Sequence, residues 1–231
     1  MLKKLWKDTE DAYIGGKGYF FLTPSHYSIY HDFSRFFRPG INGLTVDLGA
    51  GRLGWKPIVE KAAKKYLSAD ISLNGKALDM VADGSKLALR LESVDTLLCM
   101  QVIEHTRDPR AILFEASRVL KKGGRAIVSF PHLSYLHGEP EDYFRFTIHG
   151  FRSLLPDGLV IEEARASGGL LCFALTPAFI FLNAAAHKVP IAGKCVYYIL
   201  SLASVVVFHA DRFLGMRRLY PLNYICGLKK T

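Results

Sequence analysis

The sequence predicts an α/β fold: a doubly wound, mostly parallel sheet with an antiparallel last strand and a hydrophobic helical insertion before that strand. From residue 44 onward, short apolar runs alternate with amphipathic stretches, a pattern typical of parallel strands covered on both faces by helices. The run TVDLGAG at residues 45–51 also reads as a strand that ends in an acid and a glycine-rich turn. Such a turn lets the backbone approach a ligand closely, because glycine has no side chain in the way.

The 231 residues suit one ordinary domain with an appendage. Half of them are hydrophobic and 12% are aromatic, which excludes a disordered chain. The four cysteines lack C-x-x-C spacing and sit among apolar neighbours, as expected of buried thiols in a reduced compartment. The basic amino terminus is not followed by the apolar core of a secretory signal, so a cytoplasmic location is expected.

The expected elements follow in chain order. Aromatic residues at helical spacing predict a helix over 25–37, within an N-terminal helical segment at 1–40 that precedes a domain at 41–231. Strands are expected near 44–48, 66–70, 78–82, 94–100, 124–130, 159–164 and 223–229, with helices near 55–65 and 109–120. The helix at 109–120 is the best defined, because Asp108 suits its N-cap and Pro109 its first turn, and Gly123-Gly124 is expected to end it.

A hydrophobic insertion at about 170–215 interrupts this rhythm. Its apolar runs at 170–182 and 195–208 are shorter than the roughly 20 residues that span a bilayer. A membrane-surface contact, a substrate lid and a dimer interface are all open to it. Membrane contact is favoured because basic residues flank the runs: Lys188, Lys194, Arg212, Arg217 and Arg218, with Trp6 beside Lys3, Lys4 and Lys7 as a second contact. The net charge of +9 is concentrated here, since the last 62 residues carry seven Lys or Arg against one acid.

The glycine turn by itself fits two cofactors. Residues 49–54, GAGRLG, match the G-x-G-x-x-G dinucleotide fingerprint, and Asp70 lies at the distance expected of its ribose acid. In open α/β sheets, however, ligands lie beyond the carboxyl ends of the strands. Three successive strands here end in an acid: Asp47, Asp70 and Asp83.

The ordered motifs VDLGAG, ADIS, ADGS and VIEHTRDP at about 43–131 resemble the class I S-adenosylmethionine-dependent methyltransferases, in particular the type 11 family that includes ubiquinone and menaquinone biosynthesis methyltransferases. The resemblance implies a Rossmann-like fold and S-adenosyl-L-methionine as cofactor. It implies that Asp47 lies near the methionyl part, that Asp70 binds the ribose hydroxyls, and that Asp83 meets the adenine edge. The full cofactor-binding set that it implies is Asp47, Gly49, Ala50, Gly51, Asp70, Ile71, Asp83, Gly84, Met100 and Gln101.

Elementary electrostatics agrees with this resemblance. A carboxylate accepts ribose hydroxyl bonds, and a negative charge near a sulfonium is favourable, whereas Asp47 would repel the pyrophosphate of a dinucleotide. The chain departs from the family at one point, because Leu53 follows Arg52 where many members have a third glycine.

The loop after the fifth strand, at 131–147, holds the candidate acceptor side. Its stretch at 137–147 resembles an H-G-x-P-x-D-Y-x-R-x-T pattern in methyltransferases of bacterial surface-polysaccharide and glycolipid pathways. The candidate catalytic residues are His137, His105, His132 and Asp142, and the candidate substrate-binding residues are Tyr143 and Arg145. A histidine there could remove a hydroxyl proton with Asp142 orienting it, while Arg145 could hold an anionic group or only brace the loop. No metal is expected, since His132, His137 and Asp142 lack a recognised ligand spacing.

The expected function is S-adenosylmethionine-dependent O-methylation of a lipid-linked sugar, glycolipid or other amphiphile at a membrane surface. An NAD-dependent oxidoreductase or epimerase on the same sheet and a non-catalytic membrane adaptor are the alternatives. The expected partners are the acceptor and an anionic membrane on its cytoplasmic face. Nucleic acid is not expected, because the basic residues alternate with aliphatic runs and no N-P-P-Y-like motif occurs.

Overall fold

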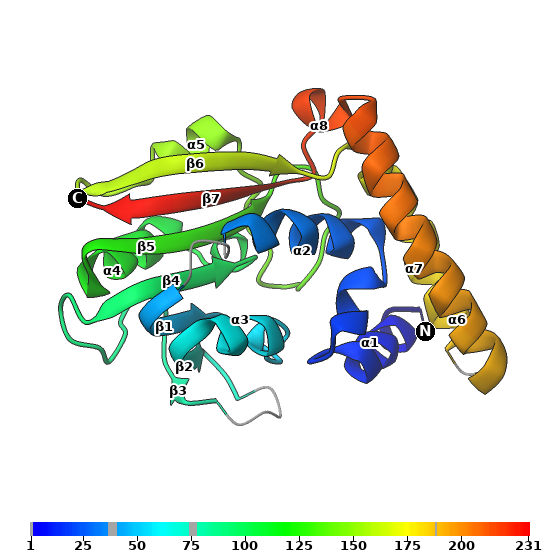
Figure 1. The fold of residues 1–231 in the computed structure, drawn as a ribbon, viewed down its shortest axis with the longest axis horizontal. Coiled ribbons are helices and arrows are strands. Elements are labelled where there is room, and N and C mark those ends of the chain that lie inside the picture. Colours follow the sequence, from blue (N-terminus) through cyan, green and yellow to red (C-terminus); the bar gives the residue numbers. More distant parts are fainter. Residues whose placement is uncertain (1, 37–40, 74–77, 188) are drawn as a thin grey trace. The chain divides into compact units, whose positions relative to one another are not determined.

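The computed structural model describes residues 2–36, 41–73, 78–187 and 189–231 (Figure 1). The chain divides into two compact units. Unit 1 comprises residues 1–34 and 166–223, and unit 2 comprises residues 35–165 and 224–231. The predicted N-terminal helical segment and the hydrophobic insertion, far apart in sequence, therefore belong to the same unit.

Unit 2 is built on a seven-stranded sheet in the order β3-β2-β1-β4-β5-β7-β6. The strands are β1 (Ile41–Leu48), β2 (Ala63–Asp70), β3 (Met80–Val81), β4 (Val94–Met100), β5 (Leu120–Pro131), β6 (Leu159–Ser167) and β7 (Asn223–Lys230). Strands β1 to β5 pair in parallel, and β7 runs against its neighbours. The predicted doubly wound sheet with an antiparallel last strand is confirmed.

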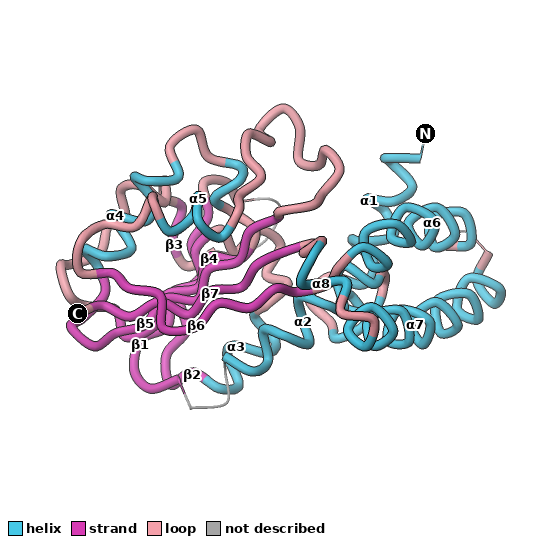
Figure 2. Tube along the Cα trace, turned by 90° about the horizontal axis from the view of Figure 1, so that it is seen from above, coloured by secondary structure: helices cyan, strands magenta, loops and turns pink. Residues whose placement is uncertain are grey.

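Helices cover both faces of this sheet. Helices α4 (Pro109–Val119) and α5 (Ile148–Arg152) lie on one face, and α3 (Lys56–Ala62) lies on the other (Figure 2). The apolar face of α4 is buried through Ile112, Leu113, Ala116 and Val119, against a core in which Val46, Leu97 and Val128 have no exposed surface. The order of the strands reverses between β1 and β4, and a ligand crevice forms at such a switch point.

The predicted bounds of α4 are confirmed to within about one residue, but the glycine pair predicted to end the helix does not do so. Asp108 caps it by accepting a hydrogen bond from the Ala111 N–H at 3.1 Å. The helix ends at Val119, and the glycine pair expected to end it lies inside β5. There Gly123 takes a φ of 75°, and the pairing of β4 with β5 shifts between Val94 and Thr96. The glycines form an irregularity within the strand, and a helix C-cap and this irregularity look alike in sequence.

Unit 1 is helical. It contains α1 (Leu2–Tyr13), the 3₁₀ helix η1 (Lys17–Phe21), most of α2 (Pro24–Phe36), α6 (Leu170–Ala186), α7 (Pro190–Phe213) and α8 (Met216–Leu219). Helices α6 and α7 lie side by side as a hairpin (Figure 2). The expectation that neither apolar run could span a bilayer is wrong for α7, because the run at 195–208 is the middle of a 24-residue helix. Among the described residues, Ile191–Phe213 is the one helix long and apolar enough to cross a membrane, judged by length and composition alone.

Candidate active site

The glycine turn after β1 closes against the neighbouring strand loops. The N–H groups of Gly49 and Ala50 both donate to the carbonyl of Ala69, at 2.8 and 3.0 Å. Gly49 has a φ of 70°, and a Cβ on it would lie 2.3 Å from Cγ2 of Val102. Gly51 has a φ of 51°, and a Cβ on it would lie no nearer than 3.9 Å to any neighbouring atom. Gly49 is therefore required by packing, whereas Gly51 leaves the backbone open to a ligand.

Asp70 at the end of β2 is held ready to accept hydrogen bonds. Its Oδ2 accepts from the Gly51 N–H at 2.8 Å, and its Oδ1 accepts from the Ser72 N–H at 3.2 Å. A carboxylate has about four lone-pair sites, so these bonds orient it and leave acceptor capacity for a pair of ribose hydroxyls. Ile71 beside it is 73% exposed and offers an apolar surface. The residues present thus fit the ribose end of an adenosyl cofactor.

Asp47 lies deeper than a direct cofactor contact requires. Its carboxylate is 1% exposed and accepts a hydrogen bond from the Tyr66 hydroxyl at 2.7 Å. Burial raises the pKa of Asp47 to about 7, with the hydrogen bond from Tyr66 opposing the shift and Asp70 adding to it. The carboxyl group expected to face a sulfonium is therefore buried against Tyr66, with its pKa raised toward neutrality.

The next two strand ends present the remaining cofactor residues. Asp83 is exposed and accepts from both the N–H and the hydroxyl of Ser85 at 2.8 Å, which lowers the pKa of its carboxyl. A Cβ on Gly84 would come within 2.8 Å of Ile112 and 3.1 Å of Leu48, so packing alone accounts for a glycine there. The contact of Asp83 with the adenine edge stays a prediction.

Met100 and Gln101 end β4 at the switch point. Met100 is buried, and Gln101 takes a φ of 57°, unusual for a residue with a side chain. The Gln101 N–H donates to the carbonyl of Ser129 at 3.0 Å, and its Nε2 donates to the Ser129 hydroxyl at 3.2 Å. Strain of this kind often marks functional sites. Ser129, which holds the conformation, has no motif that would have identified it.

Leu53 adopts the conformation that the missing third glycine would favour. It has a φ of 62°, and its N–H donates to the carbonyl of Ala50 at 2.7 Å. The turn therefore closes without glycine, at a cost of roughly 1–2 kcal/mol for a left-handed residue with a side chain.

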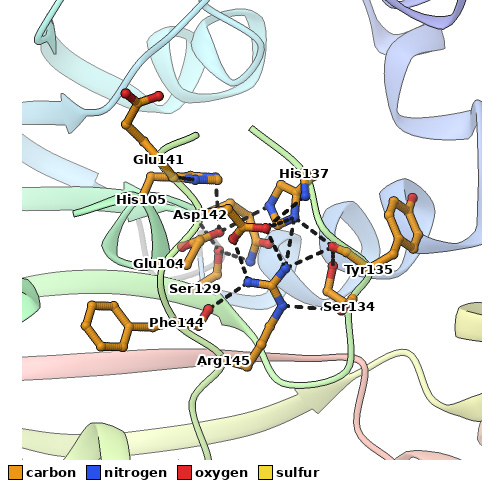
Figure 3. A network of polar contacts seen from close by, with 11 residues as sticks. Glu104, His105, Ser129, Ser134, Tyr135, His137, Glu141, Asp142, Phe144 and Arg145 are labelled. Atoms are coloured by element: carbon orange, nitrogen blue, oxygen red, sulfur yellow. Dashed lines mark hydrogen bonds and ion pairs between the residues drawn. The ribbon is translucent and has the colours of Figure 1, made fainter. Parts of the chain in front are cut away.

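On the acceptor side, the loop after β5 folds over the loop after β4 (Figure 3). The N–H groups of Tyr143 and Phe144 donate to the carbonyl of Glu104 at 2.9 and 3.3 Å. Asp142 accepts from the His137 N–H at 2.8 Å, and its two oxygens accept from Arg145 at 2.6 and 2.8 Å. Arg145 holds the pKa of Asp142 well below its usual range, so this carboxylate is ionised at neutral pH.

Arg145 acts as a brace in this structure. Besides Asp142, its guanidinium donates to the carbonyls of Ser134, Tyr135 and Phe144. A guanidinium has five N–H donors, and these bonds occupy all of them. Holding a substrate anion, the other role expected for Arg145, would require some of these bonds to break.

Glu104 is a further candidate functional residue, which the set predicted from the sequence omits. Its side chain is 0% exposed, and neither carboxylate oxygen has a hydrogen-bond partner among the described residues. Its Oε1 lies 3.9 Å from Nε2 of His105 and 3.9 Å from Nε2 of His137. Burying a carboxylate is costly unless a charge compensates for it. The I-E-H-T-R motif placed Glu104 in a loop, and no sequence signal showed that two imidazoles converge on it.

These three residues define the acceptor-side centre: Glu104, His105 and His137. The rings of His105 and His137 meet edge to face at 4.9 Å, and Nδ1 of His105 contacts the carbonyl of Glu141 at 2.6 Å. Burial alone would lower the pKa of His137, but Glu104, the Tyr135 carbonyl and Asp142 outweigh it and raise that pKa above the usual 6.5.

The centre offers three ligand atoms within 4.8 Å of one another and could hold a divalent cation. The ligand set considered from the sequence is His132, His137 and Asp142, and these three side chains do not come together in the structure. His132 contacts the carbonyl of Phe146 at 3.0 Å, and Asp142 is engaged by Arg145. Tyr143 lies 39% exposed with its hydroxyl accepting from Arg107 at 3.2 Å, so neither His132 nor Tyr143 is part of the centre.

Together, the open sheet, the glycine turn at its switch point and the oriented Asp70 define an α/β domain that binds an adenosyl cofactor. The strand order also differs from the 3-2-1-4-5-6 order of dinucleotide-binding folds, because β7 lies between β5 and β6.

Comparisons with known proteins identify this domain. A methyltransferase domain family matches residues 46–128. The mitochondrial ubiquinone biosynthesis O-methyltransferase of Schizosaccharomyces pombe is 36% identical over 76 residues, which are 32% of this chain and 26% of that protein. The chain thus matches about a quarter of the length of this curated relative. Residues 46–128 form the core of a class I S-adenosylmethionine-dependent methyltransferase domain, and S-adenosyl-L-methionine is its cofactor.

Solved structures share the fold. The [4+2]-cyclase SpnF is 15% identical with a TM-score of 0.57, covering 86% of this chain and 80% of its own. A geranyl diphosphate C-methyltransferase from Streptomyces coelicolor A3(2) is 13% identical with a TM-score of 0.54, covering 87% of this chain and 76% of its own. One is described as a cyclase and the other as a C-methyltransferase. The fold alone therefore does not determine the acceptor chemistry, which depends on the residues of the site.

Proposed function

We propose that this protein transfers a methyl group from S-adenosylmethionine to a hydroxyl of a lipid-linked sugar, glycolipid or other amphiphilic small molecule at a membrane surface. The observation that carries the proposal is the acceptor-side centre, where the buried carboxylate of Glu104 lies 3.9 Å from Nε2 of the partly exposed His137. An oxygen nucleophile needs its proton removed as it attacks, and this pair is suited to accept it.

On the cofactor side, the role of the chain is to bind and orient S-adenosylmethionine. Asp70 accepts ribose hydroxyls, while the turn at Gly49 and Gly51 brings the backbone close to the cofactor. S-adenosylmethionine supplies a methyl group on a positively charged sulfonium. The role of the protein is to align the acceptor oxygen with that methyl group for in-line displacement.

On the acceptor side, His137 is the proposed base. Its Nδ1 lies 3.2 Å from the carbonyl of Tyr135 and 3.4 Å from the Arg145 guanidinium. We assign hydrogen to Nδ1, because the carbonyl is the nearer partner and Asp142 and backbone carbonyls already accept from the Arg145 donors. The lone pair then lies on Nε2, toward Glu104. With the cofactor bound, the acceptor oxygen would bond to the methyl carbon as the carbon–sulfur bond breaks and its electron pair goes to sulfur, and Nε2 of His137 would take the hydroxyl proton. The Glu104 carboxylate stabilises the resulting imidazolium.

A second arrangement of the same centre is favoured by the unpartnered carboxylate of Glu104. A divalent cation on Glu104, His105 and His137 would compensate the buried charge and bind the acceptor oxygen, lowering the pKa of its hydroxyl. Dialysis against a chelator separates the two arrangements. Unchanged methyl transfer supports His137 as the base, and loss of activity that added cation restores supports the cation.

The amphiphilic acceptor and the cytoplasmic face of an anionic membrane are proposed from the apolar, basic helices of unit 1. Methyl transfer is tested by incubating the protein with labelled S-adenosylmethionine and extracted glycolipids, followed by mass spectrometry of the products. Calorimetric titration should show binding of S-adenosylhomocysteine, weakened at least tenfold by Asp70→Ala. Binding of NAD alone would favour the oxidoreductase, and cofactor binding without methylation of any extracted lipid would favour the non-catalytic adaptor.

A further inference from the structure

The helix hairpin of unit 1 exposes apolar side chains and buries polar ones. On α6 the exposed side chains are all apolar, and the inward ones include Thr176 at 1% and Asn183 at 4% exposure. The exposed set on α6 is Leu170, Ala174, Leu175, Pro177, Ala178, Phe181, Leu182 and Ala185. A helix at the surface of a soluble domain has the opposite arrangement, with charged residues outward.

The same reversal runs along α7. Its inward face carries Ser204 and Asp211, exposed by 0% and 1%, together with Leu200 and Phe208. Its outward stripe, at helical spacing, consists of Ile191, Cys195, Tyr198, Ile199, Leu202, Val206, His209 and Phe213. Only His209 in this stripe has a strongly polar side chain.

The inward polar groups are used within unit 1. Asn183 donates to the carbonyl of Leu22 at 2.9 Å, and the hydroxyl of Tyr197 donates to that of Gly18 at 3.1 Å. Ser204 donates to the carbonyl of Phe21 at 3.4 Å. The hairpin is thus fixed by hydrogen bonds to the segment around η1, and this fixes which side chains point outward.

Basic residues mark the two ends of the apolar stripe on α7. Lys194 and Arg212 are exposed near its start and end, about 27 Å apart at 1.5 Å per residue. Arg217 and Arg218 follow in α8. The acid in residues 166–223 is Asp211 alone, and it is buried. Within residues 166–223 the exposed charged side chains are therefore all basic, complementary to anionic lipid headgroups.

We infer that the hairpin of α6 and α7 inserts into a phospholipid bilayer, with its outward apolar side chains among the acyl chains and its basic residues at anionic headgroups. Lipid accounts for both features at once, because acyl chains cover the apolar stripe and the long stems of Lys194 and Arg212 let their charges reach the headgroups. A second copy of the chain would bury the stripe and would also bring the two sets of cations together.

Flotation of the full-length protein with vesicles tests this inference. The protein should float with vesicles of phosphatidylcholine and phosphatidylglycerol, and at least tenfold less should float after the double change Ile199→Glu and Leu202→Glu. The matched control is Phe114→Glu, a comparably exposed apolar residue of α4 in unit 2, which should leave flotation unchanged. Both variants should retain the thermal shift on adding S-adenosylhomocysteine, so that loss of lipid binding is not confused with misfolding.

Two results would overturn the inference. One is wild-type protein that stays at the bottom of the gradient with every vesicle composition. The other is a detergent-free soluble dimer that Ile199→Glu and Leu202→Glu convert to a monomer, which would assign the stripe to a second copy. Neither result bears on methyl transfer, because the cofactor residues lie in unit 2.

Discussion

Gly49 holds together the two loops that meet at the switch point of the sheet. Its φ of 70° and the 2.3 Å approach of a Cβ to Val102 predict that Gly49→Ala destabilises the domain by about 3 kcal/mol, from left-handed strain and overpacking. Chemical denaturation measures this change, and cofactor affinity should fall with it.

Two companion variants separate the causes of that loss. Gly51→Ala keeps the strain without the contact, because nothing lies nearer than 3.9 Å, so it should cost about 1–2 kcal/mol. Adding Val102→Ala to Gly49→Ala should recover part of the loss by removing the contact. Equal costs for the two glycine variants would contradict the packing argument.

The pair of Glu104 and His137 predicts a pH dependence at the residue scale. A base must be unprotonated to act, and the pKa of His137 is raised above 6.5, so the acid limb of kcat/KM should lie above pH 6.5. Glu104→Gln removes the neighbouring charge and leaves the burial, which lowers the pKa. The acid limb should therefore move to lower pH, with a reduced kcat.

The same pair has a stability counterpart, with its sign fixed by the raised pKa. The pair of protonated His137 with Glu104 stabilises the fold fully below about pH 6.5, and this contribution is lost as the pH rises through the folded-state pKa. Unfolding curves of wild type and Glu104→Gln should therefore converge as the pH rises. An acid limb that stays in place in Glu104→Gln would show that His137 is not the titrating base.

At the scale of elements, Asp211 ties α7 to the start of α6. Helix α6 has Gly169 at its N-cap and no side-chain cap of its own. The buried carboxylate of Asp211 accepts from the N–H groups of Gly169 at 2.5 Å and Cys172 at 3.3 Å. Asp211→Ala should therefore destabilise unit 1 by about 2 kcal/mol, since a helix N-terminus loses its acceptor.

Limited proteolysis followed by mass spectrometry localises this effect. Cleavage within residues 170–213 should become faster in Asp211→Ala, while cleavage in unit 2 should not. The adjacent Arg212→Ala serves as control, because Arg212 is exposed and no cap depends on it. If both variants are cleaved at the wild-type rate, the cap contributes nothing to the hairpin.

Some helices and strands could be predicted from the sequence with the correct bounds, and others could not. Strand β4 has the bounds predicted for it, because a buried run between turn signals leaves little freedom. The Gly123-Gly124 pair was assigned to the end of α4 and lies in β5, because glycine serves caps and strand irregularities equally. At the site, Asp70 could be placed by its strand end. Glu104 could not, because only His105 of its two imidazole partners is its neighbour in sequence, and His137 reaches it from the loop after β5.

At the scale of the whole molecule, exposed apolar side chains and basic residues occur together in the hairpin of α6 and α7 and in α8. Residues 166–223 carry five Lys or Arg against one acid, Asp211, which is buried. Two forces therefore attract the protein to an anionic membrane, and salt distinguishes them, because exposed charges are screened within about 3 Å at 1 M salt while apolar burial is not weakened.

This combination of apolar and basic residues predicts a graded salt response of lipid binding. Raising salt to 1 M after binding should leave most of the protein on phosphatidylcholine–phosphatidylglycerol vesicles, because the apolar stripe is already inserted, whereas salt present from the start should slow association by removing steering. Stopped-flow fluorescence of Trp6 in unit 1 and flotation at each salt concentration measure the two effects. Complete release by 1 M salt would mean that only the cations contact the membrane, and that the outward residues of α6 and α7 stay in water.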